Sequence, residues 1–369
     1  MKKVLYLGGF ELPDRNAAAH RVMANAKLLR EMGFDVAFVG ISKDIVNAPK
    51  VVDGFKNNPI PYPVGTKAWL HYIVTFVDFH IISEHKPDYV VIYNFPSIAS
   101  LKILRACHKR GIKVVHDLTE WECARGRSFR EFIHKCDIDL RMHYCVKKMD
   151  GVIAISRYLY DYYKNYTNTI LVPPLVDLSA AKWKRNRMHA IDGRIRLVYA
   201  GNAGFGTKDR LDVIVDAIAR HPDMRLDVVG MTVEQFMAAY GHFPGGCKNI
   251  FFHGRISHEK TIEIVQESDF QLLIRDNSLK NKAGFPTKFV ESMACGTPII
   301  ATLTSNLEDY LKDGFNGFIV NENQSLDEIL LSVEQLSSVE IDKMKENCKN
   351  ITAFDYREYK LVFEQIFGR

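Results

Sequence analysis

The chain has 369 residues, of which 47% are hydrophobic and 25% are charged, and this balance excludes a disordered or fibrous protein. The net charge is +5, from 49 Lys and Arg against 44 Asp and Glu. This is too weak to indicate nucleic-acid binding, but it suits an anionic ligand or an acidic membrane surface. The length is about twice that of a common domain and predicts two domains.

The first half of the chain alternates short apolar strands with amphipathic helices. Val22, Ala26 and Leu29 recur at helical spacing, and Gly33 ends that helix. A long aromatic helix is expected from Trp69 to His85. The predicted strands of this half are 4–7, 35–41, 89–93, 112–115, 152–155 and 170–172, and a further helix is predicted at 97–109.

The alternation stops between Pro173 and Arg194, where two prolines and a polar, basic stretch predict an interdomain linker, 173–194. It then restarts, with strands at 195–200, 226–229, 250–252, 270–274, 298–301 and 317–320 and helices at 211–220, 259–267 and 287–294. This pattern predicts two doubly wound α/β domains, 1–172 and 195–350, each with a parallel sheet covered on both faces. Ligands of such sheets bind at the carboxyl ends of the strands, so the site is expected in a cleft between the domains.

The cysteine and hydropathy patterns predict a cytoplasmic protein. The seven cysteines are scattered, and no pair has the C-x-x-C spacing of a zinc or redox site. An odd number without a disulfide framework fits a reducing compartment. The first apolar run is too short for a signal peptide, and no run of about 18 apolar residues predicts a membrane span.

Two glycines, Gly8 and Gly9, follow the first strand, where glycine lets the backbone approach a ligand closely. The loop lacks the G-x-G-x-x-G spacing, which disfavours a dinucleotide cofactor. A tight turn without a ligand explains the pair equally well.

The strongest signal is the string AGFPTKFVESMACGTPIIA at Ala283–Ala301. Gly284 and Pro286 open a helix, so the backbone amides near Phe285 to Lys288 and the helix dipole favour a diphosphate. Glu291 lies one turn into this helix, where its carboxylate suits the hydroxyls of a ribose.

This string resembles the signature of glycosyltransferase family 4, whose members are retaining enzymes with the two-domain GT-B fold. The resemblance covers nearly the whole chain, including the loop that starts at Gly201, the segment Phe252–Ile256 and a final helix around 354–367. It implies a glycosyltransferase of polysaccharide biosynthesis that takes a nucleotide-sugar donor and a saccharide or lipid-linked saccharide acceptor, with no metal ion and no other cofactor. It also implies that residues 351–369 form a C-terminal helix that packs back on the acceptor-side N-terminal domain.

The resemblance assigns roles to matching positions. Glu291 would hold the ribose, and Gly254 to Ile256 would meet the base through the backbone. Lys208 would neutralise the leaving diphosphate, whose negative charge grows as the glycosidic bond breaks. The expected substrate-binding residues are Gly9, Asn202, Gly254, Arg255, Ile256, Asp276, Gly284, Phe285, Pro286, Thr287, Lys288 and Glu291.

His116 is the second expected catalytic residue, because it ends a predicted strand where the family commonly has a histidine near the donor sugar and the acceptor. Asp117, Glu120 and Glu122 are nearby carboxylates, one of which an inverting enzyme would need as a general base. The resemblance favours retention instead, in which the leaving phosphate takes the acceptor proton.

Two positions depart from the family pattern. The family usually has a glutamate eight residues before Glu291, where this chain has Ala283, and Asp276 or Asn277 could partly substitute. It also tends to have an arginine where this chain has Asn202, so that a phosphate-binding cation is missing unless Lys288 replaces it.

These departures support one alternative, a non-catalytic nucleotide-sugar-binding subunit. A GT-B nucleotide-sugar epimerase is the other alternative. Separately, the basic segment 125–148 interleaves Lys and Arg with Phe129, Phe132 and Ile133. It predicts either peripheral contact with an anionic membrane or a solvated helix that covers the first sheet.

Overall fold

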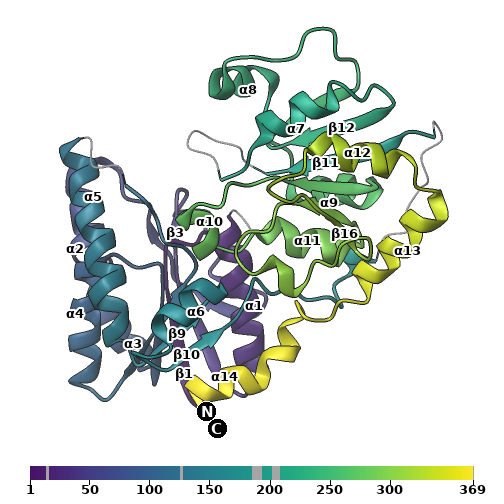
Figure 1. The fold of residues 1–369 in the computed structure, drawn as a ribbon. Helices are drawn as coiled ribbons and strands as arrows, with labels where there is room; N and C mark the ends of the chain where they lie inside the picture. The colour runs from purple at the N-terminus through teal and green to yellow at the C-terminus, as the bar shows by residue number, and fades with distance from the viewer. Residues whose placement is uncertain (14–15, 125–127, 185–192, 202–207, 369) are drawn as a thin grey trace. The chain divides into compact units, whose positions relative to one another are not determined.

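The computed structural model describes residues 1–13, 16–124, 128–184, 193–201 and 208–368 (Figure 1). The chain divides into two compact units. Unit 1 comprises Met1–Val176, Lys282–Phe285 and Asp355–Arg369, and unit 2 comprises Asp177–Asn281 and Pro286–Phe354. The division therefore falls at Val176, within the predicted linker, and the end of the chain belongs to the first unit.

The apolar runs of the first half form the sheet of unit 1. The described residues give an eight-stranded sheet in the order β10-β9-β8-β7-β1-β2-β5-β4, parallel except for the pair β4 and β5. Its central strands are buried along their length, as in a parallel sheet covered on both faces. The strands are β1 (Lys3–Gly8), β2 (Asp35–Val39), β4 (Val51–Val52), β5 (Phe55–Asn57), β7 (Tyr89–Tyr93), β8 (Lys113–Leu118), β9 (Gly151–Ala154) and β10 (Thr169–Leu171), while β3 (Ile41–Ser42) and β6 (Ile60–Pro61) pair separately.

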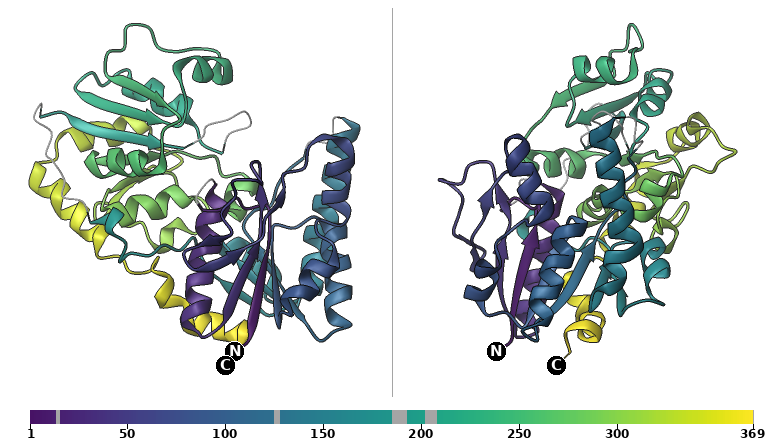
Figure 2. Two further views of the ribbon diagram at one scale, coloured as in Figure 1. Left: turned by 180° about the vertical axis from the view of Figure 1, so that it is seen from behind. Right: turned by 90° about the vertical axis from the view of Figure 1, so that its left-hand side faces the viewer.

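Helices cover both faces of this sheet (Figure 2). The helices are α1 (Ala17–Glu31), α2 (Gly65–Val74), α3 (Phe79–His85), α4 (Ser97–His108), α5 (Phe129–Leu140), α6 (Arg157–Tyr163) and α14 (Lys360–Phe367), with a π-helical turn at Arg141–Cys145. Helices α1 and α14 share one core with the sheet, and α3 and α4 share the core on the other face. The Tyr89 hydroxyl donates to the carbonyl oxygen of Phe367 at 2.7 Å and so ties α14 to β7.

The prediction of one long helix from Trp69 to His85 is wrong, because α2 and α3 are separate helices. Between them Phe76 has a φ of 60°, in the left-handed region that a bulky residue rarely adopts. Its side chain is 2% exposed, and its ring lies 4.1 Å from that of Phe95. Burial of this ring compensates for the unfavourable backbone, and helical periodicity does not reveal such a break.

Unit 2 is a second doubly wound domain. Its described residues give a six-stranded parallel sheet in the order β13-β12-β11-β14-β15-β16. The strands are β11 (Ile195–Ala200), β12 (Met224–Val229), β13 (Ile250–Gly254), β14 (Phe270–Leu273), β15 (Ile299–Ala301) and β16 (Gly317–Ile319). The helices are α7 (Leu211–Ile218), α8 (Val233–Tyr240), α9 (His258–Glu267), α10 (Leu279–Ala283), α11 (Thr287–Cys295), α12 (Leu326–Glu334) and α13 (Ser338–Lys349).

Helix α8 has no counterpart among the predicted elements. Thr232 and Gln235 form a capping box at its start, and Gly241 ends it in the left-handed conformation. These signals are present in the sequence, but the helix is too short to show a long apolar period.

The order of both sheets reverses beside the first strand of each unit. In unit 1 the reversal lies between β1 and β7, and in unit 2 it lies between β11 and β14. The connections there leave the sheet toward opposite faces, which opens a crevice at the carboxyl ends of the strands. Within the part of the chain that the structure describes, every helix falls short of the length and apolar content of a membrane span.

Candidate functional site

Polar side chains gather where the order of the unit 2 sheet reverses. Strand β11 ends at Ala200 and β14 ends at Leu273. Just beyond these ends, Asp209 and Arg275 form an isolated antiparallel bridge. The sheet thus holds two loops side by side at its carboxyl edge.

Asp209 lies at the centre of a buried ion-pair cluster. Its carboxylate accepts hydrogen bonds from Arg275 Nε at 2.6 Å, Lys288 Nζ at 2.5 Å and the Tyr199 hydroxyl at 2.8 Å. Burial raises the pKa of the Asp209 carboxyl, but Lys288 and Arg275 outweigh burial and hold it well below its usual range. Two cations thus share the Asp209 carboxylate, and Glu291 is a further negative charge that acts on Lys288.

Lys288 reaches from α11 to the loop that follows β11. Its Nζ occupies the space that a side chain on residue 201 would need, so the close approach depends on Gly201. The same nitrogen lies 4.3 Å from the centre of the Tyr199 ring. Lys288 thus stands beside the residue that precedes Asn202, and Asn202 itself lies outside the described residues.

Helix α11 also presents its N-terminus and Glu291. Pro286 precedes the helix, and a proline side chain cannot accept the hydrogen bonds of the first-turn amides, which begin at Thr287. One turn on, Oε1 of Glu291 lies 2.9 Å from Nε2 of His258 at the start of α9. The two side chains are 25% and 24% exposed, so both are partly accessible to solvent.

Lys208 and Asp276 are held together by Asn281. The Asn281 side-chain amide donates to the carbonyl oxygen of Lys208 at 3.1 Å and to that of Asp276 at 2.8 Å. The Asp276 side chain is 64% exposed and lies 3.4 Å from Arg210. Two predicted ligand-binding residues, 68 positions apart in the sequence, are therefore brought to one place.

A pocket of about 630 Å³ opens beside these loops. Its lining includes Ile274, Thr302 and Val320, which directly follow β14, β15 and β16, together with Arg275 and Asp276. This volume is in the range of small-molecule sites, but the lining contains neither Lys288 nor Glu291.

The segment predicted to meet a base also lies at the carboxyl edge of unit 2. Strand β13 ends at Gly254, which has a φ of 63° and so needs the freedom of glycine. Its carbonyl oxygen accepts a hydrogen bond from the amide of Gly230 at 2.8 Å. Arg255 and Ile256 then lead into α9, and the Arg255 side chain is exposed.

The glycine-rich turn before α11 belongs to unit 1, although its neighbours in the chain belong to unit 2. Just before this turn Ala283, the last residue of α10, is 0% exposed, and its carbonyl oxygen accepts a hydrogen bond from Ser156 Oγ at 2.8 Å. Gly284 and Phe285 are buried as well. A glutamate at residue 283 would place a carboxylate in these packed surroundings, which is costly without a partner.

Glycines allow close approach at the carboxyl edge of unit 1. A Cβ on Gly8 would lie 2.7 Å from Cβ of Tyr93 on β7, and a Cβ on Gly9 would lie 3.1 Å from the Tyr72 hydroxyl. The pair therefore has a packing role in the turn after β1, and Gly9 faces a hydroxyl group.

His116 lies inside β8 rather than at its end, because the strand continues to Leu118. Its side chain is 0% exposed, and neither ring nitrogen has a hydrogen-bond partner among the described residues. Burial, together with the charge of Arg141, lowers the pKa of His116 to about 3, so the ring is neutral near pH 7. A buried polar group without a partner is costly, and packing alone does not account for it.

The three carboxylates near His116 have different surroundings. Asp117 is fully buried and accepts hydrogen bonds from Arg21 Nε at 2.8 Å and from the Tyr6 hydroxyl. These partners occupy it as a structural group, which removes it from the candidates for a general base. Glu122 lies 3.4 Å from Arg141, and Glu120 lies 3.4 Å from the Asn94 amide.

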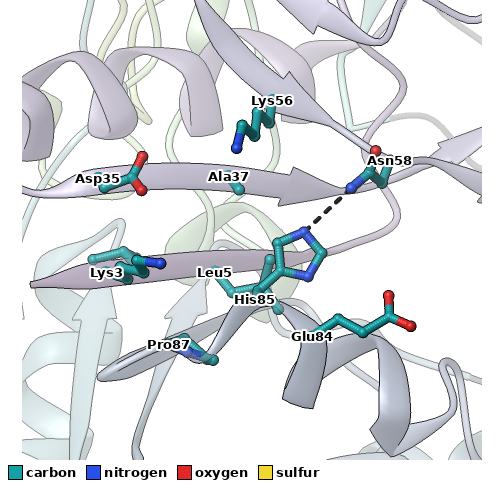
Figure 3. Close-up of a pocket in the computed structure, with 10 residues that line it drawn as sticks. Lys3, Leu5, Asp35, Ala37, Lys56, Asn58, Glu84, His85 and Pro87 are labelled. Carbon is teal, nitrogen blue, oxygen red and sulfur yellow. Dashed lines mark hydrogen bonds between the residues drawn. The ribbon is translucent and has the colours of Figure 1, made fainter.

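Unit 1 has a pocket of about 290 Å³ at the amino ends of its strands (Figure 3). Lys3 and Asp35, which begin β1 and β2, line it, and Nε2 of His85 lies 3.2 Å from the Asn58 amide. Because it is at the amino ends of the strands, it is not where this kind of sheet binds its ligands.

Most of unit 2 matches a known protein family. Residues 184–353 match the family "Glycosyl transferases group 1". An uncharacterized glycosyltransferase of Methanocaldococcus jannaschii is 23% identical over 243 residues, which cover 60% of this chain and 59% of the relative. The match thus spans less than two thirds of that relative's length.

Two solved structures resemble the chain over its whole length. Sucrose-phosphate synthase from Thermosynechococcus elongatus has a TM-score of 0.74 at 15% identity. The match covers 100% of this chain and 98% of the synthase chain. Anabaena HepE in complex with UDP-glucose has a TM-score of 0.68 at 14% identity, with 99% of each chain covered. The chain therefore has the GT-B fold, and its residues 184–353 are similar to the glycosyl transferases group 1 family.

Proposed function

We propose that this protein is a glycosyltransferase that moves a sugar from a nucleotide-sugar donor to a saccharide or lipid-linked saccharide, with retention of configuration and without a metal ion. The observation that carries the proposal is the meeting of two cations, Lys288 and Arg275, at Asp209 on the carboxyl edge of unit 2, where α11 begins. The group 1 match over the same unit supports it.

In this proposal the nucleotide end of the donor binds unit 2. Glu291 holds the ribose hydroxyls, Gly254 to Ile256 meet the base, and Asp276 faces the sugar. The amides of Phe285 to Thr287, with Lys208 and Lys288, hold the diphosphate, which the positive end of α11 also favours. Asn202, which lies outside the described residues, and Gly284, which belongs to unit 1, stay predicted substrate-binding residues.

The transfer breaks the bond between the anomeric carbon and the diphosphate oxygen and forms a bond to the acceptor oxygen. Negative charge grows on the leaving diphosphate, and Lys208 stabilises that charge. The leaving phosphate takes the proton of the acceptor hydroxyl, so the reaction needs no protein carboxylate as a base. An ammonium group here supplies the charge that a divalent cation supplies in other transferases.

The test is a thermal-shift screen of nucleotide-sugars in the presence of EDTA, followed by transfer assays with the donor that stabilises the protein most. The proposal expects a shift of the unfolding temperature and EDTA-resistant release of nucleoside diphosphate that depends on an acceptor. Conversion of the donor without an acceptor would indicate the epimerase, and binding without any turnover would indicate the binding subunit.

His116 is proposed to contact the donor sugar or the acceptor hydroxyl through its unpartnered ring. We expect His116→Leu to lower kcat about tenfold or more, because the lost hydrogen bond belongs to the reacting sugars. The free energy of unfolding of this variant, measured relative to that of the native chain, should be about 2 kcal/mol higher at pH 5 than at pH 7.

The sign of this pH effect follows from the lowered pKa of His116. Below its ordinary pKa of 6.5 the unfolded chain takes up a proton, whereas the folded chain does not until about pH 3. The native chain therefore loses stability as the pH falls through this window, and leucine removes that loss. Urea unfolding of both proteins at pH 5 and pH 7 measures this effect. If the two proteins differed in free energy of unfolding by the same amount at both pH values, the result would contradict a buried neutral ring.

Peripheral membrane contact is proposed for α5, in the basic segment 125–148. Phe129, Phe132 and Ile133 are 81%, 55% and 45% exposed, and Lys135 lies on the same helix. These exposed apolar side chains suit insertion at a membrane surface, although the same helix also carries Glu131, Asp137 and Asp139. We expect the double variant Phe129→Ser, Phe132→Ser to lose co-sedimentation with phosphatidylglycerol vesicles, with Leu361→Ser on α14 as an exposed control. Equal sedimentation of all three proteins would contradict the contact.

A further inference from the structure

We propose that Asp209 is the positioning residue of the donor site, which holds Lys288 and Arg275 where they meet the diphosphate. The inference rests on the proposed function, because it assigns these cations to the nucleotide end of a donor. Asp209 acts through its neighbours and does not itself touch the substrate, since a carboxylate repels a diphosphate.

The first argument is that both carboxylate oxygens of Asp209 accept hydrogen bonds from neighbouring side chains. Oδ1 accepts from Arg275 Nε, and Oδ2 accepts from Lys288 Nζ and from the Tyr199 hydroxyl. The side chains of Asp209 and Arg275 are only 6% and 7% exposed. The carboxylate thus bonds one cation from the loop after β14 and one from helix α11 at once, which fixes the distance between them.

The second argument is that the partners are fixed independently. The amide of Arg275 donates to Oγ1 of Thr302 at 2.8 Å, and that hydroxyl donates back to the Arg275 carbonyl at 2.9 Å. Lys288 is in the first turn of α11, with its chain passing over Gly201. The backbones are therefore in place, and the Lys288 ammonium is the flexible part that Asp209 orients.

The third argument is electrostatic. Lys288 and Arg275 are both largely buried and repel each other, and burial lowers the pKa of Lys288 while Asp209 opposes the change. Glu291 also faces Lys288, but its carboxylate bonds His258. Without the Asp209 charge, Lys288 would lose its proton at a lower pH and would turn away from Arg275.

The test is calorimetric titration of UDP and GDP between pH 6 and pH 9. We expect Asp209→Asn to weaken binding of the preferred nucleotide about tenfold at pH 8, and to move the alkaline loss of binding to lower pH. Lys288→Met should bind weakly at every pH, and adding Asp209→Asn to it should cost little more. Asp209→Asn combined with Lys288→Arg should lose the shifted pH dependence, because an arginine stays charged. Asp212→Asn, the same chemical change on α7, should bind as the native chain does.

Native-like binding by Asp209→Asn at every pH would overturn the inference. It would also be overturned if Asp209→Asn weakened nucleotide binding as much in the Lys288→Met variant as in the native chain. A native chain that binds neither nucleotide would contradict the proposed function itself, together with the inference. If Asp209→Asn does not fold, Tyr199→Phe serves instead, because it removes one bond to the carboxylate. It should weaken binding about threefold, and unchanged binding would overturn the inference.

Discussion

Replacing Lys208 by alanine is expected to lower kcat for sugar transfer by about 100- to 1000-fold, with a smaller change in KM for the donor. The reason is that charge develops on the leaving diphosphate in the transition state, so a fixed cation matters more there than in the ground state. The Asn281 amide donates to the Lys208 carbonyl oxygen at 3.1 Å, which holds the backbone of Lys208 in place. Initial rates over a range of donor concentrations separate kcat from KM.

Lys343→Ala is the matched control for this change, because Lys343 is exposed on α13. Lys208→Arg should recover part of the lost rate, since it restores the charge with a different shape. Turnover near that of the native chain in Lys208→Ala would remove Lys208 from the mechanism.

Replacing Glu291 by alanine is expected to raise KM for the donor about 10- to 100-fold. A carboxylate that accepts two ribose hydroxyls makes charge-assisted bonds, which are the stronger kind. These bonds exist in both the ground state and the transition state, so kcat should change less than KM. The change also frees His258, whose Nε2 lies 2.9 Å from the Glu291 carboxylate, and His258→Ala measures that indirect effect.

A donor that lacks the 2′-hydroxyl separates ribose contact from other effects. The native chain should use the 2′-deoxy donor about tenfold less efficiently, whereas Glu291→Ala should use the two donors almost equally well. Glu346→Ala, an exposed carboxylate on α13, should behave as the native chain does. If Glu291→Ala still distinguished the two donors as strongly, the ribose would be bound elsewhere.

The sequence predicted the strands better than the helices. Apolar runs such as Tyr89–Tyr93 become strands because both faces of a parallel sheet are buried, and this leaves a continuous apolar signal. The break in the expected helix 69–85 escaped detection because it depends on the buried ring of Phe76, a tertiary contact. The predicted strand 112–115 is shorter than β8, because the polar residues His116 and Asp117 are typical of a strand end. In the structure both side chains are buried within the strand.

At the candidate site, the sequence indicated Lys288 and Glu291 through the helix-opening motif but gave no sign of Asp209 or Arg275. Asp209 lies 66 residues from Arg275 and 79 from Lys288, so their pairing depends on the order of the strands in the sheet. Local periodicity contains no information about that order. In the sequence, Asp209 differs from other carboxylates only because it directly follows Lys208, the lysine expected to bind the phosphate.

The central claim is that the carboxyl edge of unit 2 holds the nucleotide end of an activated sugar. A crystal structure of the chain with the nucleoside diphosphate that stabilises it most tests this claim directly. We predict phosphate oxygens within hydrogen-bond distance of Lys208, Lys288 and the first amides of α11, and the ribose hydroxyls on Glu291. A nucleotide bound elsewhere, for example in the pocket at the amino ends of the unit 1 strands, would contradict it.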